Sequence, residues 1–338
     1  GRAAHGLIGP VGPVPQICNG MHLHPTDDVV ATVARAKPGS TFCFHKGSYA
    51  LKSPIIPRSN DSFIGEIDGR VVLSGNDVTP NAIRGTYSDA IGVRIAGMVV
   101  EHFAEEGIDA RSSPGTNWII ENNEMRFNGW SGAEPAQITR NNYIHHNGVV
   151  GLEGGYASED MLIVNNELAF NNTKRQYTSG DNGGAKFIRT IRLRVLHNYS
   201  HDNDGAGLWT DGNNIFTEYA FNRIENNAQS GLTHEVSCDA SIHDNVFRNN
   251  NTETNLWHGG EIYIHSSPNV EVFANEVSTR GNGIVLRDSS RPKDDAIIQQ
   301  CAVHASVFRI RNVHVRQNKI NQAGRSGMVG DSSESFTR

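Results

Sequence analysis

Three side chains from the middle of the sequence, Lys186, Asp211 and Glu235, are of the types that acid–base chemistry requires. A pair of carboxyl groups can act as general acid and general base, or as acid and nucleophile. A lysine whose pKa is lowered by partial burial can take a proton from carbon. These residues are far apart in the sequence, so they can act together only if the fold brings them together.

A recurring glycine predicts how these side chains are arranged. It opens a short stretch, usually with an apolar residue next, in the segments 107–111, 151–153, 184–188, 207–211, 231–235, 260–262 and 283–287. Alternate residues of a β-strand face opposite sides, so an inward apolar residue turns the second and fourth residues after the glycine outward. The outward set comprises Asp109, Arg111, Glu153, Lys186, Trp209, Asp211, Thr233, Glu235 and Arg287. If these segments are stacked strands about 4.8 Å apart, Lys186, Asp211 and Glu235 are neighbours.

An asparagine repeat indicates what kind of fold stacks these strands. Two asparagines five residues apart enclose a short apolar-centred segment in the pairs Asn123 and Asn128, Asn142 and Asn147, Asn166 and Asn171, Asn198 and Asn203, Asn222 and Asn227, and Asn245 and Asn250. Asn275 and Asn318 keep the first half of the pattern, and the base period is near 23 residues. Short strands with Asn and Gly at their corners predict a right-handed parallel β-helix, in which equivalent asparagines form a hydrogen-bonded ladder along the axis.

Composition supports an all-β fold and excludes several functional classes. The chain has 338 residues, 35 of them glycine, and its net charge is −6. A long helical fold is excluded because Gly, Asn and Asp are poor helix formers. We expect no nucleic-acid partner because there is no basic run, and no membrane partner because there is no apolar run long enough to span a bilayer.

The two ends of the chain are expected to differ from the repeat. Thr26, Asp27 and Asp28 precede an apolar face and predict a short helix that caps the open end of the coil. We therefore expect one domain, with an N-terminal segment and cap over 1–40, the β-helix over 41–322 and a loose polar tail over 323–338. Cys18 and Cys43 flank a short segment and suit a disulfide, which would indicate a secreted or periplasmic protein.

The asparagine repeats resemble those of the pectate-lyase-like right-handed parallel β-helix superfamily, over roughly residues 40 to 322. That superfamily includes polysaccharide lyases, alginate epimerases, glycoside hydrolases and phage tailspikes. The polygalacturonase-type Asn-Thr-Asp and Gly-His-Gly motifs are absent, as is the epimerase-type Asp-Pro-His-Asp motif. The resemblance thus implies the fold and a polysaccharide partner, but it transfers no catalytic residue.

Our first functional hypothesis is a polysaccharide lyase that acts by β-elimination on a uronate. Lys186 would be the base, and His234, Arg189 or Tyr177 would neutralise the carboxylate or protonate the leaving group. No cofactor is certain; Ca²⁺ held by oxygen ligands such as Asp181, Glu153 and Asp211 would be an alternative way to neutralise the uronate.

Two alternatives use the same groove. In a glycoside hydrolase, Asp211 and Glu235 would be the catalytic carboxylates, and Lys186 would only hold substrate. A glycan-binding or adhesin β-helix would bind there without chemistry. In every case Trp209 offers a flat surface to a sugar ring, Glu153 and Arg189 would bind substrate, and the insertions that carry Tyr177 and Trp257 would form the groove walls. His234 adjoins Glu235 and is for that reason the histidine we single out.

Overall fold

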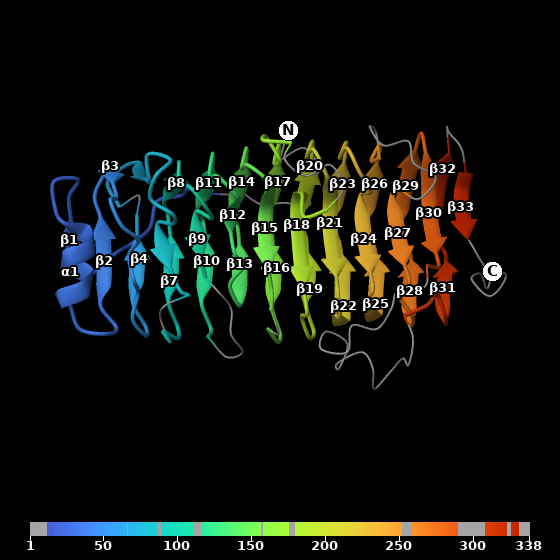
Figure 1. The fold of residues 1–338 in the computed structure, drawn as a ribbon, viewed down its shortest axis with the longest axis horizontal. Coiled ribbons are helices and arrows are strands. Elements are labelled where there is room, and N and C mark those ends of the chain that lie inside the picture. Colours follow the sequence, from blue (N-terminus) through green and yellow to red (C-terminus); the bar gives the residue numbers. More distant parts are fainter. Residues whose placement is uncertain are drawn as a thin grey trace.

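The computed structural model describes residues 12–65, 67–86, 89–110, 116–156, 158–175, 180–251, 259–289, 308–322 and 326–330. Its strands form three sheets, in which every paired strand runs parallel to its neighbour, and together the sheets make an elongated coil (Figure 1). Each turn of the coil contributes one strand to each sheet, so residues roughly one repeat apart in sequence become neighbours.

Sheet A has 12 strands. In order they are β1 (Met21–Leu23), β2 (Thr41–Phe44), β4 (Ser62–Ile64), β7 (Arg94–Ala96), β10 (Ile119–Glu121), β13 (Ile138–Arg140), β16 (Leu162–Val164), β19 (Arg194–Leu196), β22 (Ile215–Ala220), β25 (Cys238–His243), β28 (Val270–Phe273) and β31 (Val313–Arg316).

Sheet B has 11 strands. They are β3 (Gly47–Ala50), β5 (Val71–Ser74), β8 (Val99–Glu101), β11 (Glu124–Arg126), β14 (Tyr143–His145), β17 (Glu167–Ala169), β20 (Tyr199–His201), β23 (Arg223–Glu225), β26 (Val246–Arg248), β29 (Glu276–Thr279) and β32 (Lys319–Gln322).

Sheet C has 10 strands. From the N-terminal end they are β6 (Ile83–Arg84), β9 (Ile108–Asp109), β12 (Ser131–Ala133), β15 (Val150–Gly154), β18 (Gly183–Ile188), β21 (Ala206–Asp211), β24 (Leu232–Glu235), β27 (Ile262–His265), β30 (Asn282–Arg287) and β33 (Ser326–Gly330).

Two buried asparagine ladders run along the coil, as the repeat predicts. In the first, the backbone N–H and the side-chain amide of Asn142 both donate to Oδ1 of Asn166, at 3.1 and 2.9 Å. The same side-chain amide also donates to the carbonyl of Ile120 in the preceding turn. The first ladder continues to Asn318. The second begins at Asn128 and ends where the amide of Asn250 donates to Glu261.

The left-handed backbone that each corner requires belongs to the residue before the ladder asparagine, not to that asparagine. Asn141 and Asn165 occupy this position with φ of 55° and 56°. His197 and Phe221 occupy it in later turns with φ of 54° and 59°, although such residues rarely adopt this conformation. The corner therefore depends on the hydrogen bonds of the ladder more than on the residue type at the strained position.

The interior of the coil is apolar and in register from turn to turn. In sheet C one inward column consists of Ile108, Ala133, Leu152, Ala185, Leu208, Leu232, Ile262 and Ile284. The glycines that open these strands lie against the second asparagine ladder. A Cβ atom on Gly207 would lie 2.8 Å from Nδ2 of Asn227 and 2.5 Å from the carbonyl oxygen of Gly231, so no larger residue fits there.

Both ends of the coil extend beyond the boundaries expected from the sequence. Sheet A begins with β1 at Met21, before residue 41, and sheet C includes β33 beyond residue 322. The expected short helix is α1 (Val29–Arg35), which lies beside β1 at the end of the coil where the sheets begin (left in Figure 1). The side chain of Asp28 accepts a hydrogen bond from the backbone of Ala31, and Val29 and Val33 are buried in the main core.

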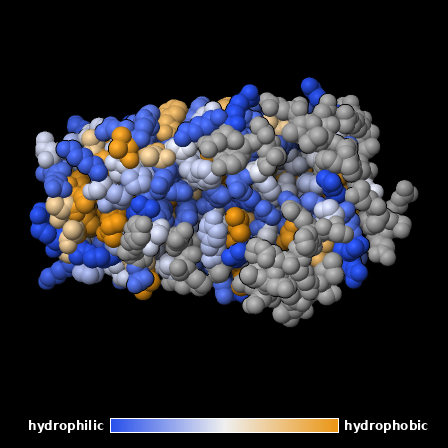
Figure 2. Space-filling view, viewed as in Figure 1, coloured by the Kyte–Doolittle hydropathy of each residue, from blue (hydrophilic) through white to orange (hydrophobic). Residues whose placement is uncertain are grey.

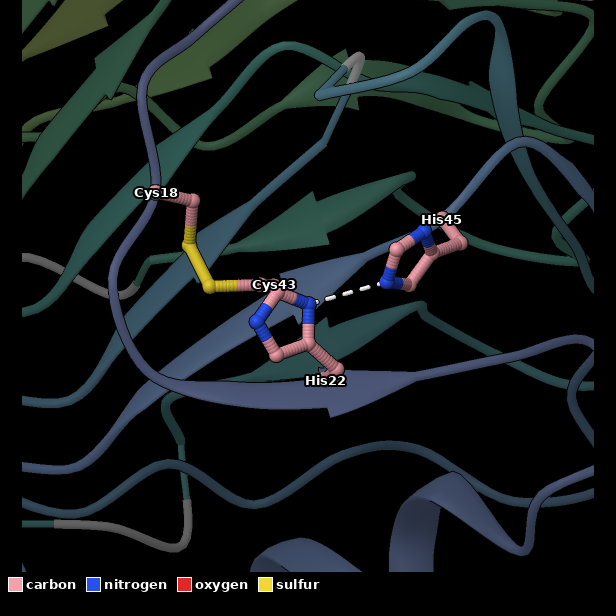
Figure 3. The surroundings of a disulfide bond; sticks show 4 residues. All are labelled: Cys18, His22, Cys43 and His45. Atoms are coloured by element: carbon pink, nitrogen blue, oxygen red, sulfur yellow. Dashed lines mark hydrogen bonds between the residues drawn. A yellow bond between two sulfur atoms is a disulfide. The ribbon is translucent and has the colours of Figure 1, made fainter.

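The disulfide expected between Cys18 and Cys43 is confirmed, with the two Cα atoms 5.7 Å apart. It ties the segment before β1 to β2 (Figure 3). Cys238 is disulfide-bonded as well, which the sequence analysis did not anticipate. Among the described residues, no helix is long and apolar enough to cross a membrane.

Candidate functional site

The outer face of sheet C carries two columns of polar side chains, in the register that the glycine pattern predicts. Glu153, Lys186, Trp209, Thr233 and Tyr263 occupy equivalent positions of successive strands. The second column lies two residues further along each strand and contains Asp211, Glu235, His265 and Arg287. The fold therefore brings Lys186, Trp209, Asp211 and Glu235 onto one surface.

Lys186 is the most constrained member of this surface. It is only 5% exposed, and its ammonium lies 2.9 Å from Oδ2 of Asp211 and also contacts Asp181. The ammonium also lies 4.2 Å from the centre of the Trp209 ring, a cation–π contact. Lys186 thus holds two carboxylates and an aromatic ring together.

The pKa of Lys186 is raised, which corrects the expectation that partial burial would lower it. Burial does act to lower this pKa, but the negative charge of Asp211 and the hydrogen bonds to Asp181 and Asp211 outweigh that effect. A lysine that remains an ammonium ion cannot accept a proton from a substrate. The expectation that the pKa of Lys186 is lowered is therefore wrong, and the hypothesis that Lys186 is the base of an elimination loses that support.

Glu153 has a different environment, one strand before Lys186. The indole Nε1 of Trp130 donates a 2.5 Å hydrogen bond to its Oε2 atom. Burial, followed by smaller effects that include the nearby negative charge of Asp181, raises the pKa of Glu153 to about 7. Glu153 can therefore exchange a proton near neutral pH, whereas the carboxylates of Asp181 and Asp211 are held by an ammonium ion.

Glu235 follows Asp211 on the next strand and is buried. Its Oε1 atom lies 3.0 Å from Nδ1 of His265, which occupies the equivalent position one strand further. Nε2 of His265 in turn contacts the hydroxyl of Ser289. Glu235 is therefore oriented by a histidine that is itself held by Ser289. Such a chain of hydrogen bonds fixes the direction of the carboxyl group.

His234 does not belong to this surface. Its side chain points into the coil, is 0% exposed, and its Nδ1 atom lies 2.7 Å from the hydroxyl of Thr210. Burial lowers the pKa of His234 to about 3, so the ring is neutral. The alternation of strand residues explains the correction, because a residue between two outward positions must face inward. His234 cannot contact a substrate on the outer face.

The remaining predicted site residues are placed less favourably or lie outside the described residues. Arg189 follows β18 in a left-handed conformation with φ of 56°, and its Nε atom is buried with no hydrogen-bond partner. No ion pair joins it to the described carboxylates. Tyr177 and Trp257 fall outside the described residues, as do the other residues of 176–179 and 252–258 in the two insertions expected to wall the groove.

The Ca²⁺ site proposed at Asp181 and Glu153 is not preassembled. Within the ranges that the structure describes, no group of three or more His, Cys, Asp or Glu side chains is arranged to hold a metal ion. The oxygen atoms of Asp181 and Asp211 already face the ammonium of Lys186. A divalent cation at this point would have to displace an internal counter-ion.

Two cavities lie away from sheet C. One of about 550 Å³ lies between α1 and β3, and its lining includes Val30, Ala34, Tyr49 and Leu51. A smaller one of about 310 Å³ is lined by His102, Phe127, His146 and Lys174, among others. Figure 2 shows a mostly hydrophilic surface along the middle of the coil, with hydrophobic atoms more frequent toward the N-terminal end. The polar surface of sheet C is thus distinct from both cavities.

Comparison with solved structures identifies the architecture. A structure described as XylC in complex with xylose superposes with a TM-score of 0.62 at 12% identity, covering 92% of this chain and 86% of that one. The fold is a parallel β-helix. The mannuronan C-5 epimerase AlgE6 A-module from Azotobacter vinelandii gives a TM-score of 0.59 at 13% identity, covering 91% and 90%. The periplasmic alginate epimerase AlgG gives 0.52 at 14% identity, covering 94% and 84%.

These likenesses confirm the expected parallel β-helix fold. No protein-family model matches the chain, and no curated protein matches its sequence at a significant level. The parallel β-helix supports several different reactions, so the chemistry must be argued from the side chains on the outer face of sheet C.

Sequence reasoning missed two residues of this surface. Trp130, which donates to Glu153, lies at the turn before β12 and outside the glycine-opened register. His265 was one of several scattered histidines, although it pairs with Glu235 on the next strand. Counting from the opening glycine would have placed Ile264 in the second column, because His265 lies five residues after Gly260 whereas Glu235 lies four after Gly231.

Proposed function

We propose that this protein is a carbohydrate-active enzyme that hydrolyses a neutral glycan on the outer face of sheet C. One observation carries the proposal: Asp211 is paired with the buried ammonium of Lys186, and Glu235 lies beside it on the adjacent strand. Two carboxyl groups with different partners on one surface are what acid-assisted glycoside cleavage requires.

Asp211 and Glu235 are paired positions of neighbouring strands, and this pairing favours a retaining mechanism. Neighbouring strands lie about 4.8 Å apart, close to the roughly 5–5.5 Å between the carboxyl groups of retaining glycosidases. In the first step an oxygen of Asp211 bonds to the anomeric carbon while the glycosidic bond breaks and Glu235 protonates the departing oxygen. In the second step Glu235 takes a proton from water, whose oxygen replaces Asp211 at that carbon. Trp209 offers its ring to the sugar.

The charge on this face favours a neutral substrate over a uronate. Its outward carboxyl groups belong to Asp109, Glu134, Glu153, Asp211 and Glu235. Two of the basic residues on the face, Arg84 and Lys186, each lie near two carboxylates. An anionic sugar would approach a surface that already carries excess negative charge, and like charges repel strongly where water is partly excluded.

β-Elimination on a uronate is the second candidate, supported by the two alginate epimerase structures with the same fold. We do not assign its base to Lys186, because a raised pKa keeps that side chain an ammonium ion. Glu153 would take that role, because a carboxylate with a pKa of about 7 is more basic than an ordinary one. Neutralisation of the uronate would then require a cation that the described residues do not preassemble.

Incubation with a panel of neutral and uronate-containing polysaccharides distinguishes hydrolysis, elimination and binding without reaction. We expect new reducing ends from a neutral glycan without absorbance near 235 nm. Absorbance at that wavelength reports an unsaturated uronate. If it appears, the reaction is an elimination and the proposed hydrolysis is wrong. Binding without any product would overturn both enzymatic proposals and leave a glycan-binding module.

We also propose that the protein works in an oxidising compartment, secreted or periplasmic. The disulfide between Cys18 and Cys43 and the disulfide-bonded Cys238 support this, because such bonds are rare in reducing compartments.

α1 is proposed to act as the N-terminal cap, since Val29 and Val33 pack on the end of the core.

A further inference from the structure

Three histidines gather on the outer face of sheet A at its N-terminal end. His22 lies in β1 and His24 follows that strand, so both face the same side. β1 pairs with β2 so that His22 is opposite Cys43 and Leu23 is opposite Phe44, and the backbone N–H of His45 donates to Leu23. His24 and His45 are therefore cross-strand neighbours, and their rings stack with centroids 4.3 Å apart.

The imidazoles of His22 and His45 point at one another. Nδ1 of His22 lies 2.8 Å from Nε2 of His45 (Figure 3). The other nitrogen of His45, Nδ1, lies 2.8 Å from Oδ2 of Asp68. The backbone N–H of Lys46 donates to the second carboxylate oxygen of Asp68 and fixes its orientation.

The carboxylate of Asp68 decides which nitrogen of His45 carries the proton. An ionised carboxylate only accepts hydrogen bonds, so Nδ1 of His45 must donate to it. Nε2 of His45 is then a lone-pair donor directed at His22. A histidine whose second nitrogen donates to a carboxylate is the usual form of a metal-binding histidine, because the carboxylate fixes the ring and raises its basicity.

The scaffold under this pair is buried and cross-linked. His45 follows β2, in which Phe42, Cys43 and Phe44 are all 0% exposed. The disulfide between Cys18 and Cys43 fastens β2 to the segment that leads into β1. Ligands carried on a fixed scaffold lose little freedom when they bind an ion.

We propose that His22 and His45 bind a divalent transition-metal ion, with Asp68 as the residue that positions His45. Bonds of about 2.0–2.1 Å to each nitrogen at a tetrahedral angle require nitrogens about 3.3 Å apart, so a separation of 2.8 Å needs to open only slightly. The ion takes the place of the proton that lies between the two rings, and His22 carries that proton on Nε2 instead, so both ligands are neutral imidazoles. Imidazole donors select Zn²⁺ or Cu²⁺ over Ca²⁺ or Mg²⁺.

The described residues preassemble no group of three metal ligands. Water fills the remaining coordination positions in this proposal. The site is independent of the proposed hydrolysis, because it lies on sheet A at the end of the coil, whereas the candidate carboxylates lie on sheet C.

The test is a calorimetric titration of the chelator-treated full chain with Zn²⁺ or Cu²⁺ alone. We expect one strong site per chain. His22→Ala and His45→Gln should each weaken its affinity at least tenfold, and Asp68→Asn about tenfold. His243→Ala is the matched control, because His243 also lies on sheet A but pairs with Glu218 and Asp244, and it should leave the affinity unchanged.

Absence of a strong site in the unaltered chain overturns the proposal, as does a site that persists at full strength in both His22→Ala and His45→Gln. Electron paramagnetic resonance of the Cu²⁺-loaded unaltered chain gives a second readout that needs no variant. We expect coupling to at least two imidazole nitrogens, and coupling to fewer contradicts the proposed ligands.

Discussion

The Nζ atom of Lys186 lies 2.9 Å from the Oδ2 atom of Asp211, and the lysine side chain is 6% exposed whereas that of Asp211 is 27% exposed. The lysine is thus an internal counter-ion that presents the carboxylate to the surface. A base would need the opposite arrangement, with a neutral amine directed toward the substrate. For this reason we assign the proposed chemistry to the carboxyl groups of Asp211 and Glu235 and not to the lysine.

Asp211→Asn and Glu235→Gln should each lower kcat/KM for hydrolysis by about 10²–10⁴-fold. Each change keeps the shape of the side chain and removes the group that forms the covalent bond or transfers the proton. Initial rates of reducing-end release on the active glycan measure the effect. Glu276→Gln, on the outer face of sheet B, is the matched control and should retain full activity. Full activity in both active-face variants would contradict the assignment.

Lys186→Gln should reduce both stability and activity. Asp181 and Asp211 would face each other without a counter-ion, and because both are partly exposed we expect a loss of about 1–3 kcal/mol in the free energy of unfolding. Urea denaturation measures this loss. Adding Asp211→Asn to Lys186→Gln should recover part of it, since the double variant carries one unpaired carboxylate, that of Asp181, instead of two that repel each other. Losses that simply add would show that the pair is not coupled.

Glu153 should give the activity a pH limit near neutrality. Its pKa is raised to about 7, chiefly by burial, so it is protonated below that pH and ionised above it. A protonated Glu153 can donate a hydrogen bond to a sugar hydroxyl, and we expect KM to rise as the pH passes through about 7. Glu153→Gln, which donates at every pH, should remove this limb from the profile. An unchanged limb in the variant would assign it to another group.

Glu261 should make the fold less stable as the pH rises. Burial raises its pKa to about 8, although Asn250 donates a 2.6 Å hydrogen bond to it. The folded-state pKa lies above the unfolded value, so the stability that Glu261 contributes is fully present below about pH 4.5 and is lost as the pH rises through about 8. Glu261→Gln should flatten the curve of unfolding free energy between pH 5 and pH 9. Parallel curves for the two proteins would contradict the raised pKa.

Asn166→Ala should cost about 2–4 kcal/mol of unfolding free energy. Asn166 accepts from the backbone and side chain of Asn142, and it donates to the carbonyl of Thr139 and to Asn198. The change would leave several buried groups without partners. Asn321→Ala, an exposed asparagine near the C-terminal end, should have little effect in the same thermal and urea unfolding measurements. Equal losses of unfolding free energy in the two variants would show that the ladder hydrogen bonds of Asn166 do not stabilise the fold.

The periodic features of this protein could be predicted from the sequence. The spacing of Asn142, Asn166 and Asn198 identified a parallel β-helix, because only a regular coil brings residues one repeat apart into contact. The register from Gly207 to Asp211 placed Trp209 and Asp211 on the outer face, since alternation along a strand is fixed by backbone geometry. The same rule, applied strictly, also places His234 inside.

The tertiary structure decided the charge states. Whether the pKa of Lys186 falls or rises depends on the number of carboxylates within a few ångströms of its ammonium, and Asp181 reaches it from outside the repeat. The pKa of Glu153 depends on burial beside Trp130, and the tautomer of His45 depends on Asp68. Periodicity determines which residues share a surface, but electrostatic interactions depend on distances and burial, and these exist only once the chain has folded.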